Sequence, residues 1–322
     1  MKNKILIVLG DPKSINSEII FKAWKKIPKI LRQRIFIISN FNLLKSQFSK
    51  LGYKIKLEKI SSYNLDIKTD NLKVINVNFN FENPFNFNEK KLKGFIHKSF
   101  NLAHNISIRD KTIIGMINCP IRKNLLGNKG YGVTEYLAAK CLIKNNSEIM
   151  LIKSDKVSVS PLTTHTDIKN VSKKITKKLL VTKIKSINYN FKKIFSKKPK
   201  IAVLGLNPHN AEYRKNSEEI KSIIPAIKTL KKNNILAKGP FAADTIFIHK
   251  YKNFDVIVGM YHDQVLAPMK SLFKFNAINI TLGLKYLRVS PDHGVSLDLI
   301  GKNKANPTSL LECIKFLNKL NK

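Results

Sequence analysis

The chain has few cysteines and no long apolar run. Only three cysteines occur in 322 residues, Cys119, Cys141 and Cys313, and they show no pairwise spacing. This pattern argues against a disulfide framework or a thiolate metal site, so we expect three buried, small apolar side chains. No apolar run approaches the roughly 20 residues needed to span a bilayer. The apolar stretch at residues 5–9 is too short for a signal peptide and no cleavage site follows it, so we expect a cytoplasmic protein without a membrane segment.

Acidic residues are scarce too, since 21 Asp and Glu stand against 59 Lys and Arg, for a net charge of +38. Such a charge attracts nucleic acids and other polyanions. The lysines that supply most of it are scattered, however, and no zinc finger, RNA-recognition signature or basic helix with interleaved aromatic residues occurs. We predict a solvated surface that helps to attract small anionic substrates, with no specific nucleic-acid partner. A basic nucleic-acid-binding protein on a degenerate enzyme scaffold is the alternative interpretation.

Apolar runs typical of buried strands alternate along the chain with stretches of helical spacing. The expected strands cover residues 4–10, 34–39, 72–77, 112–117, 148–153, 157–161, 201–206, 255–260 and 277–282. The expected helices cover residues 18–27, 43–51, 89–104, 135–143, 167–188, 217–231, 242–249 and 309–320. This alternation predicts an α/β fold whose sheet is largely parallel and covered on both faces.

Three histidines stand in short polar peptides at or beyond the ends of expected strands. They are His165 in Thr163-Thr164-His165, His209 in Asn207-Pro208-His209, and His262 in Tyr261-His262-Asp263-Gln264. Imidazole is the commonest protein ligand for a borderline metal, and α/β folds assemble their sites at the carboxyl ends of strands. The pattern indicates a metal-dependent enzyme, although the residues alone leave open whether all three histidines share one site.

Other polar residues have the chemistry to bind an anion. Arg288 suits a bidentate grip on phosphate or carboxylate, and Lys270 supplies a second positive charge. Asn279 is an amide within an apolar strand, where a substrate could satisfy its hydrogen bonds. Residues 10–18 leave a strand and open a helix, a place that can cradle an anion. They match neither GxGxxG nor GxxxxGK[ST], and a plain turn with Ser17 as the helix N-cap is the alternative.

Short motifs along nearly the whole chain resemble those of one family, in the family's order. They are Gly10-Asp11-Pro12 with Glu18, Cys119-Pro120-Ile121-Arg122-Lys123, Thr134-Glu135-Tyr136-Leu137, Thr163-Thr164-His165, Gly205-Leu206-Asn207-Pro208-His209, Gly239-Pro240 with Ala243-Asp244-Thr245, Tyr261-His262-Asp263-Gln264, and residues 279–298. As a set they resemble the 4-hydroxythreonine-4-phosphate dehydrogenase (PdxA) family of pyridoxal phosphate, or vitamin B6, biosynthesis.

The resemblance implies an isocitrate/isopropylmalate dehydrogenase-like α/β fold rather than a Rossmann domain. Two α/β lobes with a mostly parallel sheet would surround a cleft. The first lobe would hold residues 1–125 and 285–322, and the second residues 126–284, with the metal ligands and the interface of a homodimer.

The resemblance also implies three groups of functional residues. The expected ligands of one divalent metal ion, Zn, Mg or Co, are His165, His209 and His262. The expected substrate contacts are Thr134, Lys270, Asn279 and Arg288. The expected contacts to the cofactor, NAD or NADP, are Asn207 and the region of Asn279. The implied reaction oxidises 4-phosphooxy-L-threonine at its C3 hydroxyl and then releases carbon dioxide to give 3-amino-2-oxopropyl phosphate; no general base is identified.

The sequence departs from the family pattern at three places. Val133 stands where the family usually has a histidine, residues 13–17 replace a small glycine-containing run, and residues 210–215 lack the family's glycines and are one residue short. The metal triad is intact, whereas the grip on substrate and cofactor changes. A related dehydrogenase for another phosphorylated hydroxy acid, such as threonate or erythronate phosphate, is therefore an alternative.

Overall fold

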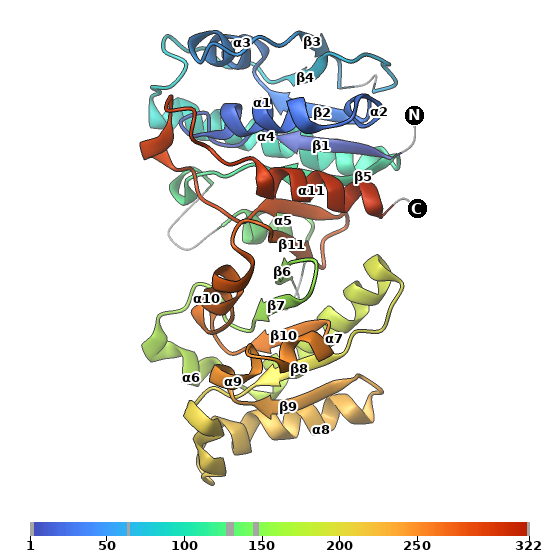
Figure 1. The fold of residues 1–322 in the computed structure, drawn as a ribbon, viewed down its shortest axis with the longest axis vertical. Coiled ribbons are helices and arrows are strands. Elements are labelled where there is room, and N and C mark those ends of the chain that lie inside the picture. The colour runs from blue at the N-terminus through green and yellow to red at the C-terminus, as the bar shows by residue number, and fades with distance from the viewer. Residues whose placement is uncertain (1–2, 63–64, 127–131, 144–147, 321–322) are drawn as a thin grey trace. The chain divides into compact units, whose positions relative to one another are not determined.

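The computed structural model describes residues 3–62, 65–126, 132–143 and 148–320. Its chain forms two compact units, one of residues 1–141 with 284–322 and one of residues 142–283 (Figure 1). The lobes implied by the family resemblance differ from these units in placing residues 126–141 and Leu284 in the second lobe. The roles expected of each lobe, including the dimer interface, stay predictions.

The described strands of the first unit form a parallel sheet in the order β3-β4-β2-β1-β5-β12. The strands are β1 (Lys4–Val8), β2 (Ile35–Ser39), β3 (Leu57–Ile60), β4 (Leu72–Asn76), β5 (Ile113–Asn118) and β12 (Arg288–Pro291). The helices are α1 (Asn16–Lys26), α2 (Lys29–Arg32), α3 (Phe41–Lys50), α4 (Glu89–Arg109), α5 (Val133–Lys140) and α11 (Thr308–Lys319), with 3-10 turns at Lys123–Leu125 and Leu297–Leu299.

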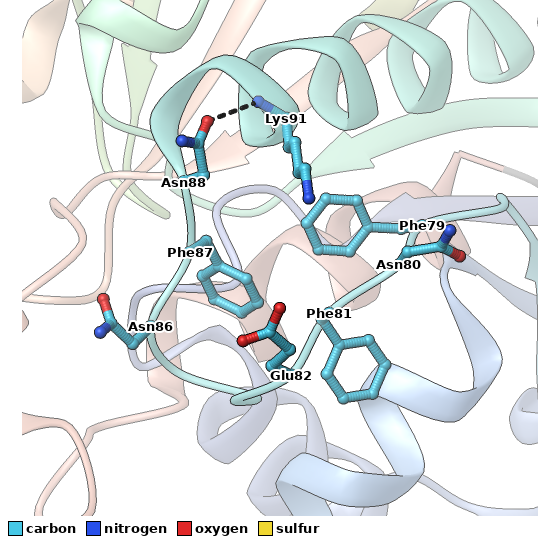
Figure 2. A pocket seen from close by; sticks show the side chains of 8 residues that line it. All are labelled: Phe79, Asn80, Phe81, Glu82, Asn86, Phe87, Asn88 and Lys91. Atoms are coloured by element: carbon cyan, nitrogen blue, oxygen red, sulfur yellow. Dashed lines mark hydrogen bonds between the residues drawn. The ribbon is translucent and has the colours of Figure 1, made fainter.

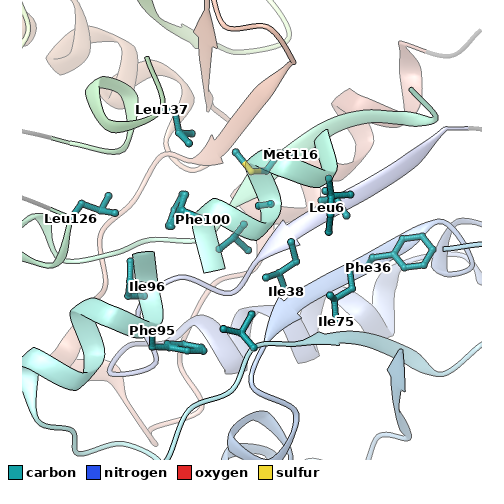
Figure 3. Packing of buried hydrophobic residues seen from close by; sticks show 14 of the residues in the cluster. Leu6, Phe36, Ile38, Ile75, Phe95, Ile96, Phe100, Met116, Leu126 and Leu137 are labelled. Carbon is teal, nitrogen blue, oxygen red and sulfur yellow. The ribbon is translucent and has the colours of Figure 1, made fainter. Parts of the chain in front are cut away.

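Alternation along the strands of this unit divides their apolar side chains between the two faces of the sheet. Leu6 and Phe36 pack in one cluster with Phe100 of α4, and all three are fully buried (Figure 3). Because successive strand residues point to opposite faces, Ile5 and Ile7, which are also buried, face the other side. Burial on both faces explains the continuous apolar runs that predicted these strands.

The segment between β4 and α4, rich in Asn and Phe, packs through its aromatic rings. The Phe79 ring lies with its centroid 4.7 Å from that of Phe95 in α4 and 5.7 Å from that of Phe87. Figure 2 shows Phe79 and Phe87 beside a pocket of about 420 Å³. Asn88 ends the segment and caps α4, since its side chain accepts hydrogen bonds from the N–H groups of Lys90 and Lys91.

The second unit has a mixed sheet in the order β11-β6-β7-β10-β8-β9, in which β6 runs antiparallel to both of its neighbours and the other pairs are parallel. The strands are β6 (Ile149–Lys153), β7 (Ser158–Pro161), β8 (Ile201–Leu204), β9 (Ala237–Phe241), β10 (Val256–Gly259) and β11 (Ile278–Leu282). The helices are α6 (Val171–Lys174), α7 (Lys177–Phe195), α8 (Ile224–Lys232), α9 (Ala243–Ile246) and α10 (His262–Phe273). Short 3-10 turns cover Ile168–Asn170, Pro208–Tyr213 and Lys250–Asn253, and a π-helical turn covers Glu219–Ile223.

The structure confirms the α/β class and the largely parallel sheets, and it corrects several expected elements. The single helix expected at residues 167–188 is broken, because the Thr176 side chain accepts a hydrogen bond from Leu179 N at 3.2 Å and starts α7 anew. His262, expected at or beyond the end of a strand, lies in the first turn of α10. None of the described helices has the length and apolar character to cross a membrane.

Lys73 of β4 gives a testable electrostatic consequence of this packing. It is fully buried, and burial lowers its pKa to about 8. Between that pH and the ordinary lysine pKa of about 10.4 the unfolded chain binds more protons, so stability should rise with pH across this window. We expect Lys73→Met to raise the free energy of unfolding at pH 7 by on the order of 2 kcal/mol and to flatten this rise, as followed by urea denaturation. The control Lys68→Met, at an exposed position, should change neither.

Candidate active site

Three neighbouring strands of the second unit lead to the three histidines. Strands β7, β10 and β8 are parallel and adjacent, so their carboxyl ends meet at one edge of the sheet. His165 follows β7, His209 follows β8 and His262 follows β10. His165 and His209 are exposed and His262 is half-buried, so all three rings are accessible to a ligand at this edge.

Hydrogen bonds tie these strand ends to one another. Thr163, two residues before His165, donates from Oγ1 to the carbonyl of Met260 at 2.8 Å. Gln264 accepts from Met260 N at 2.7 Å and donates from Nε2 to the carbonyl of Gly205 at 2.8 Å. The Thr163 bond joins the ends of β7 and β10, and the Gln264 bonds join those of β10 and β8. The three histidine-bearing peptides are therefore connected by backbone-directed bonds.

The rings of His165 and His262, two of the expected metal ligands, lie near each other. Their ring centroids lie 6.5 Å apart. His262 Nδ1 lies 2.6 Å from Asp263 Oδ1, the kind of carboxylate contact that orients the ring of a metal-ligating histidine. This donor set fits a borderline divalent metal. Within the described residues, however, no three His, Cys, Asp or Glu side chains gather closely enough to hold an ion, so the three-histidine site stays a prediction.

His209 lies in a turn whose backbone is left-handed. Residues 209–213 all have φ between 49° and 57°, and none is glycine. A left-handed conformation costs a non-glycine residue roughly 1–2 kcal/mol. This is the segment in which the sequence lacks the glycines usual in the resembled family, so we infer that neighbouring contacts must compensate for its strain.

Glu219 supplies such contacts at the start of the turn. Its Oε1 accepts hydrogen bonds from Leu206 N at 2.8 Å and Asn207 N at 2.9 Å, and its Oε2 accepts from Asn207 Nδ2 at 3.0 Å. Glu218 accepts a further bond from Asn207 Nδ2 at 2.9 Å. Burial alone would raise the pKa of Glu219, but these hydrogen bonds hold it below its ordinary value. Asn207, expected to contact the cofactor, thus commits its amide nitrogen to two carboxylates.

We expect Glu219→Gln to loosen the turn, because a neutral amide replaces a charged acceptor of three hydrogen bonds. The predicted cost is about 1.5–3 kcal/mol in the free energy of unfolding. Amide hydrogen exchange at residues 206 and 207 should also become faster. Glu212→Gln, at an exposed position in the same turn, is the control. Unchanged exchange in Glu219→Gln would show that the turn is held by other contacts.

Arg288 and Thr134 lie together in the first unit. Arg288 begins β12 and is 3% exposed. It donates from Nε to Asn118 Oδ1 at 2.6 Å and from one terminal nitrogen to Thr134 Oγ1 at 3.4 Å. Burial lowers the pKa of Arg288 to about 10, so the guanidinium is still charged at neutral pH. A buried cation of this kind favours an anionic ligand, and Asn118 is a supporting residue that sequence reasoning missed.

The other two expected substrate residues belong to the second unit. Asn279 lies in β11, and its Oδ1 is buried without a hydrogen-bond partner among the described residues. A buried amide oxygen without a donor is costly, so a ligand that donates to it would stabilise it. Lys270 is exposed on α10. Two of the four expected substrate residues therefore belong to the first unit, Thr134 and Arg288. The other two, Lys270 and Asn279, belong to the second.

The turn after β1 is built by buried polar contacts. Asp11 is fully buried, and its Oδ2 accepts from Arg122 Nε at 2.6 Å. Gly10 has φ +80°, and a Cβ there would lie 2.6 Å from the carbonyl oxygen of Pro120, so the close approach requires glycine. The N-cap of α1 is Ile15, so the alternative that made Ser17 the cap was wrong. The ion pair of Asp11 with Arg122 therefore joins the loop after β1 to the loop after β5.

Val133 is the first residue of α5 and packs against the apolar cluster of the first unit. Its methyl groups can neither donate a hydrogen bond nor carry charge. Where the family pattern usually has a histidine, this chain therefore places an apolar side chain against that cluster.

Comparison with known proteins gives one consistent family. The family model "Pyridoxal phosphate biosynthetic protein PdxA" matches residues 31–317. The chain is 37% identical over 320 residues to a 4-hydroxythreonine-4-phosphate dehydrogenase from Sulfurihydrogenibium sp. (strain YO3AOP1), covering 97% of each chain. The crystal structure of such a dehydrogenase from Klebsiella pneumoniae superposes with a TM-score of 0.85 at 23% identity and covers both chains completely. Isocitrate dehydrogenase from Methylococcus capsulatus has a TM-score of 0.50 at 10% identity, over 99% of this chain and 86% of that one, which confirms the expected fold.

Proposed function

The chain belongs to the PdxA family of pyridoxal phosphate biosynthesis, and from this premise we propose that it oxidises 4-phosphooxy-L-threonine with NAD or NADP. The oxidation takes place at the C3 hydroxyl, and the β-keto acid that results loses carbon dioxide to give 3-amino-2-oxopropyl phosphate. The observation that carries the proposal is the full-length relationship to dehydrogenases named for this substrate. The nucleic-acid-binding alternative is not favoured, because the chain keeps the polar residues of the family's site.

Arg288 is the residue that we assign to the substrate's phosphate. It is buried, charged and held by hydrogen bonds to Asn118 and Thr134, so its guanidinium is oriented before an anion binds. Thr134 can turn its hydroxyl to the same anion. Lys270 adds a second positive charge, and the unsatisfied oxygen of Asn279 suits a substrate or cofactor donor.

His165, His209 and His262 are assigned to one divalent metal, Zn, Mg or Co. A bound divalent ion would lower the pKa of the C3 hydroxyl and stabilise negative charge on that oxygen. The contribution of the chain is to hold the three strand ends together through Thr163 and Gln264. We assign NAD or NADP contacts to Asn207 and the Asn279 region. We also propose that the protein is cytoplasmic and a homodimer. Light scattering would test the dimer by its molecular mass.

The test is a steady-state assay of the purified protein with each candidate substrate. It compares 4-phosphooxy-L-threonine with threonate 4-phosphate and erythronate 4-phosphate, using NAD or NADP and Zn²⁺, Mg²⁺ or Co²⁺. We expect the highest kcat/KM with 4-phosphooxy-L-threonine. A higher value with either sugar acid phosphate would replace the proposal with the alternative dehydrogenase.

Val133→His is expected to lower KM for 4-phosphooxy-L-threonine while kcat changes little. One hydrogen bond to a charged group contributes about 1.5–3 kcal/mol, which corresponds to a roughly ten- to hundredfold change in affinity. The control Val133→Leu keeps the apolar contact and should leave KM close to that of the natural protein. An inactive natural protein that Val133→His does not rescue would contradict the B6-pathway assignment.

A further inference from the structure

The second unit has a pocket at the amino ends of the strands that carry the histidines at their carboxyl ends. Its wall includes Lys156 before β7, Lys200 before β8 and Asp255 before β10. Parallel strands place these amino ends at one edge of the sheet and the histidines at the other. The pocket is therefore separate from the candidate active site, and its volume of about 860 Å³ is in the range of small-molecule sites.

The pocket is strongly cationic. Its lysines come from four separate segments of the sequence and are Lys156, Lys197, Lys200, Lys238, Lys250 and Lys252. Of the described residues that line it, only Asp255 is acidic. Asp255 is already engaged, since its Oδ1 lies 2.7 Å from Lys197 Nζ and its Oδ2 accepts from Lys200 N at 2.8 Å. The other five lysines form no ion pair with a described residue, so their charges repel one another unless an anion enters.

The remaining wall is apolar and partly aromatic. Phe241 and Phe254 are half-buried, with ring centroids 5.3 Å apart and an interplanar angle of 63°. Leu236 lines the same pocket and is 47% exposed, so it adds accessible apolar surface to this wall. An anion that also carries a flat apolar group would use both parts of this wall.

We propose that this pocket binds a nucleoside polyphosphate. Lysine ammonium groups suit the charge of consecutive phosphates, and the Phe241, Phe254 and Leu236 surface suits a purine or pyrimidine base. Lysines from separate segments of the sequence surround one hollow here, beside accessible apolar groups. The site is independent of the proposed dehydrogenase reaction.

Calorimetric titration with ATP tests the phosphate part. The triple variant Lys200→Ala, Lys238→Ala, Lys250→Ala should weaken ATP binding by at least about tenfold, since each lost contact to a charged group matters at this scale. The matched control Lys173→Ala, Lys231→Ala, Lys232→Ala removes the same charge from exposed helical positions of the same unit and should change binding less than about twofold. Equal losses in both triples would mean that net charge alone attracts ATP, which would overturn the proposal. No measurable binding to the natural protein would overturn it too.

Two further experiments distinguish binding of the base from binding of the phosphates, and binding in this pocket from binding in the candidate active site. Phe254→Leu and the milder Leu236→Ala should each weaken ATP binding and leave binding of tripolyphosphate unchanged, with thermal melts to establish folding. Unchanged ATP binding in Leu236→Ala would reject the nucleoside and leave only a polyphosphate. His209→Ala should retain ATP binding in full, and a loss there would show that ATP occupies the candidate active site instead.

Discussion

His209→Ala is expected to abolish turnover and leave the fold intact. The imidazole is exposed in the turn after β8, so its removal costs little packing. As one of three proposed metal ligands it is needed for catalysis, because two histidines hold a divalent ion too weakly and in the wrong geometry. Loss of the ion typically removes several kcal/mol of transition-state stabilisation. The measurements are kcat, the bound divalent metal (Zn, Mg or Co) by elemental analysis, and the thermal melting curve.

His249→Ala is the matched control for this experiment. That histidine is also exposed and belongs to the same unit, but it precedes the 3-10 turn at Lys250–Asn253 without a side-chain capping hydrogen bond and is not a proposed metal ligand. It should keep natural activity and metal content. If His209→Ala retained both its bound metal and more than about a tenth of natural kcat, the three-histidine site would have to be abandoned.

Arg288→Ala should weaken phosphorylated substrate binding far more than binding of the analogue without phosphate. Truncating one partner of a desolvated charge pair costs about 2–5 kcal/mol, or roughly thirty- to several-thousandfold in affinity. Arg288 is suited to this role because it is 3% exposed and held by Asn118 and Thr134. Binding of both compounds is measured by calorimetry.

Since the alanine variant also leaves a buried hole, Arg288→Lys provides the second measurement. It keeps the charge and most of the volume but loses the fork that donates to Asn118 and to an anion at once. We expect an intermediate loss. The exposed Arg109→Ala controls for a general decrease in positive charge. Equal losses for the phosphorylated and unphosphorylated compounds would assign Arg288 to another contact.

The sequence predicted those elements in which nearly every residue is buried and therefore apolar. Strands such as β1 and β10 are buried on both faces and read as continuous apolar runs. Strand β9 was missed because Ala237–Phe241 contains Gly239-Pro240 and lies at the edge of its sheet, where little side-chain burial is required. Strand β12 was missed because four residues that begin with a buried arginine carry no periodic signal.

The histidine peptides could be found because imidazole is rare and stands out at strand ends. Their supports could not be found in this way. Glu219 lies ten residues beyond His209, and nothing in an isolated glutamate indicates that it turns back to the N–H groups of Leu206 and Asn207. Asn118 carried a weak signal, an amide at the end of an apolar strand, of the same kind that marked Asn279. Such contacts depend on tertiary structure, which a single sequence does not reveal.

The positions of the three thiols allow the unfolding of the first unit to be followed by thiol labelling. Cys119, Cys141 and Cys313 are all buried, as expected, and all belong to the first unit, whereas residues 142–283 contain no cysteine. A thiol reagent can reach them only when that unit opens, so the labelling rate measures its opening free energy alone. Pulsed alkylation in denaturant would then follow one unit, while tyrosine and circular dichroism signals follow both. A difference between the denaturant midpoints of the two transitions would show that the units unfold separately.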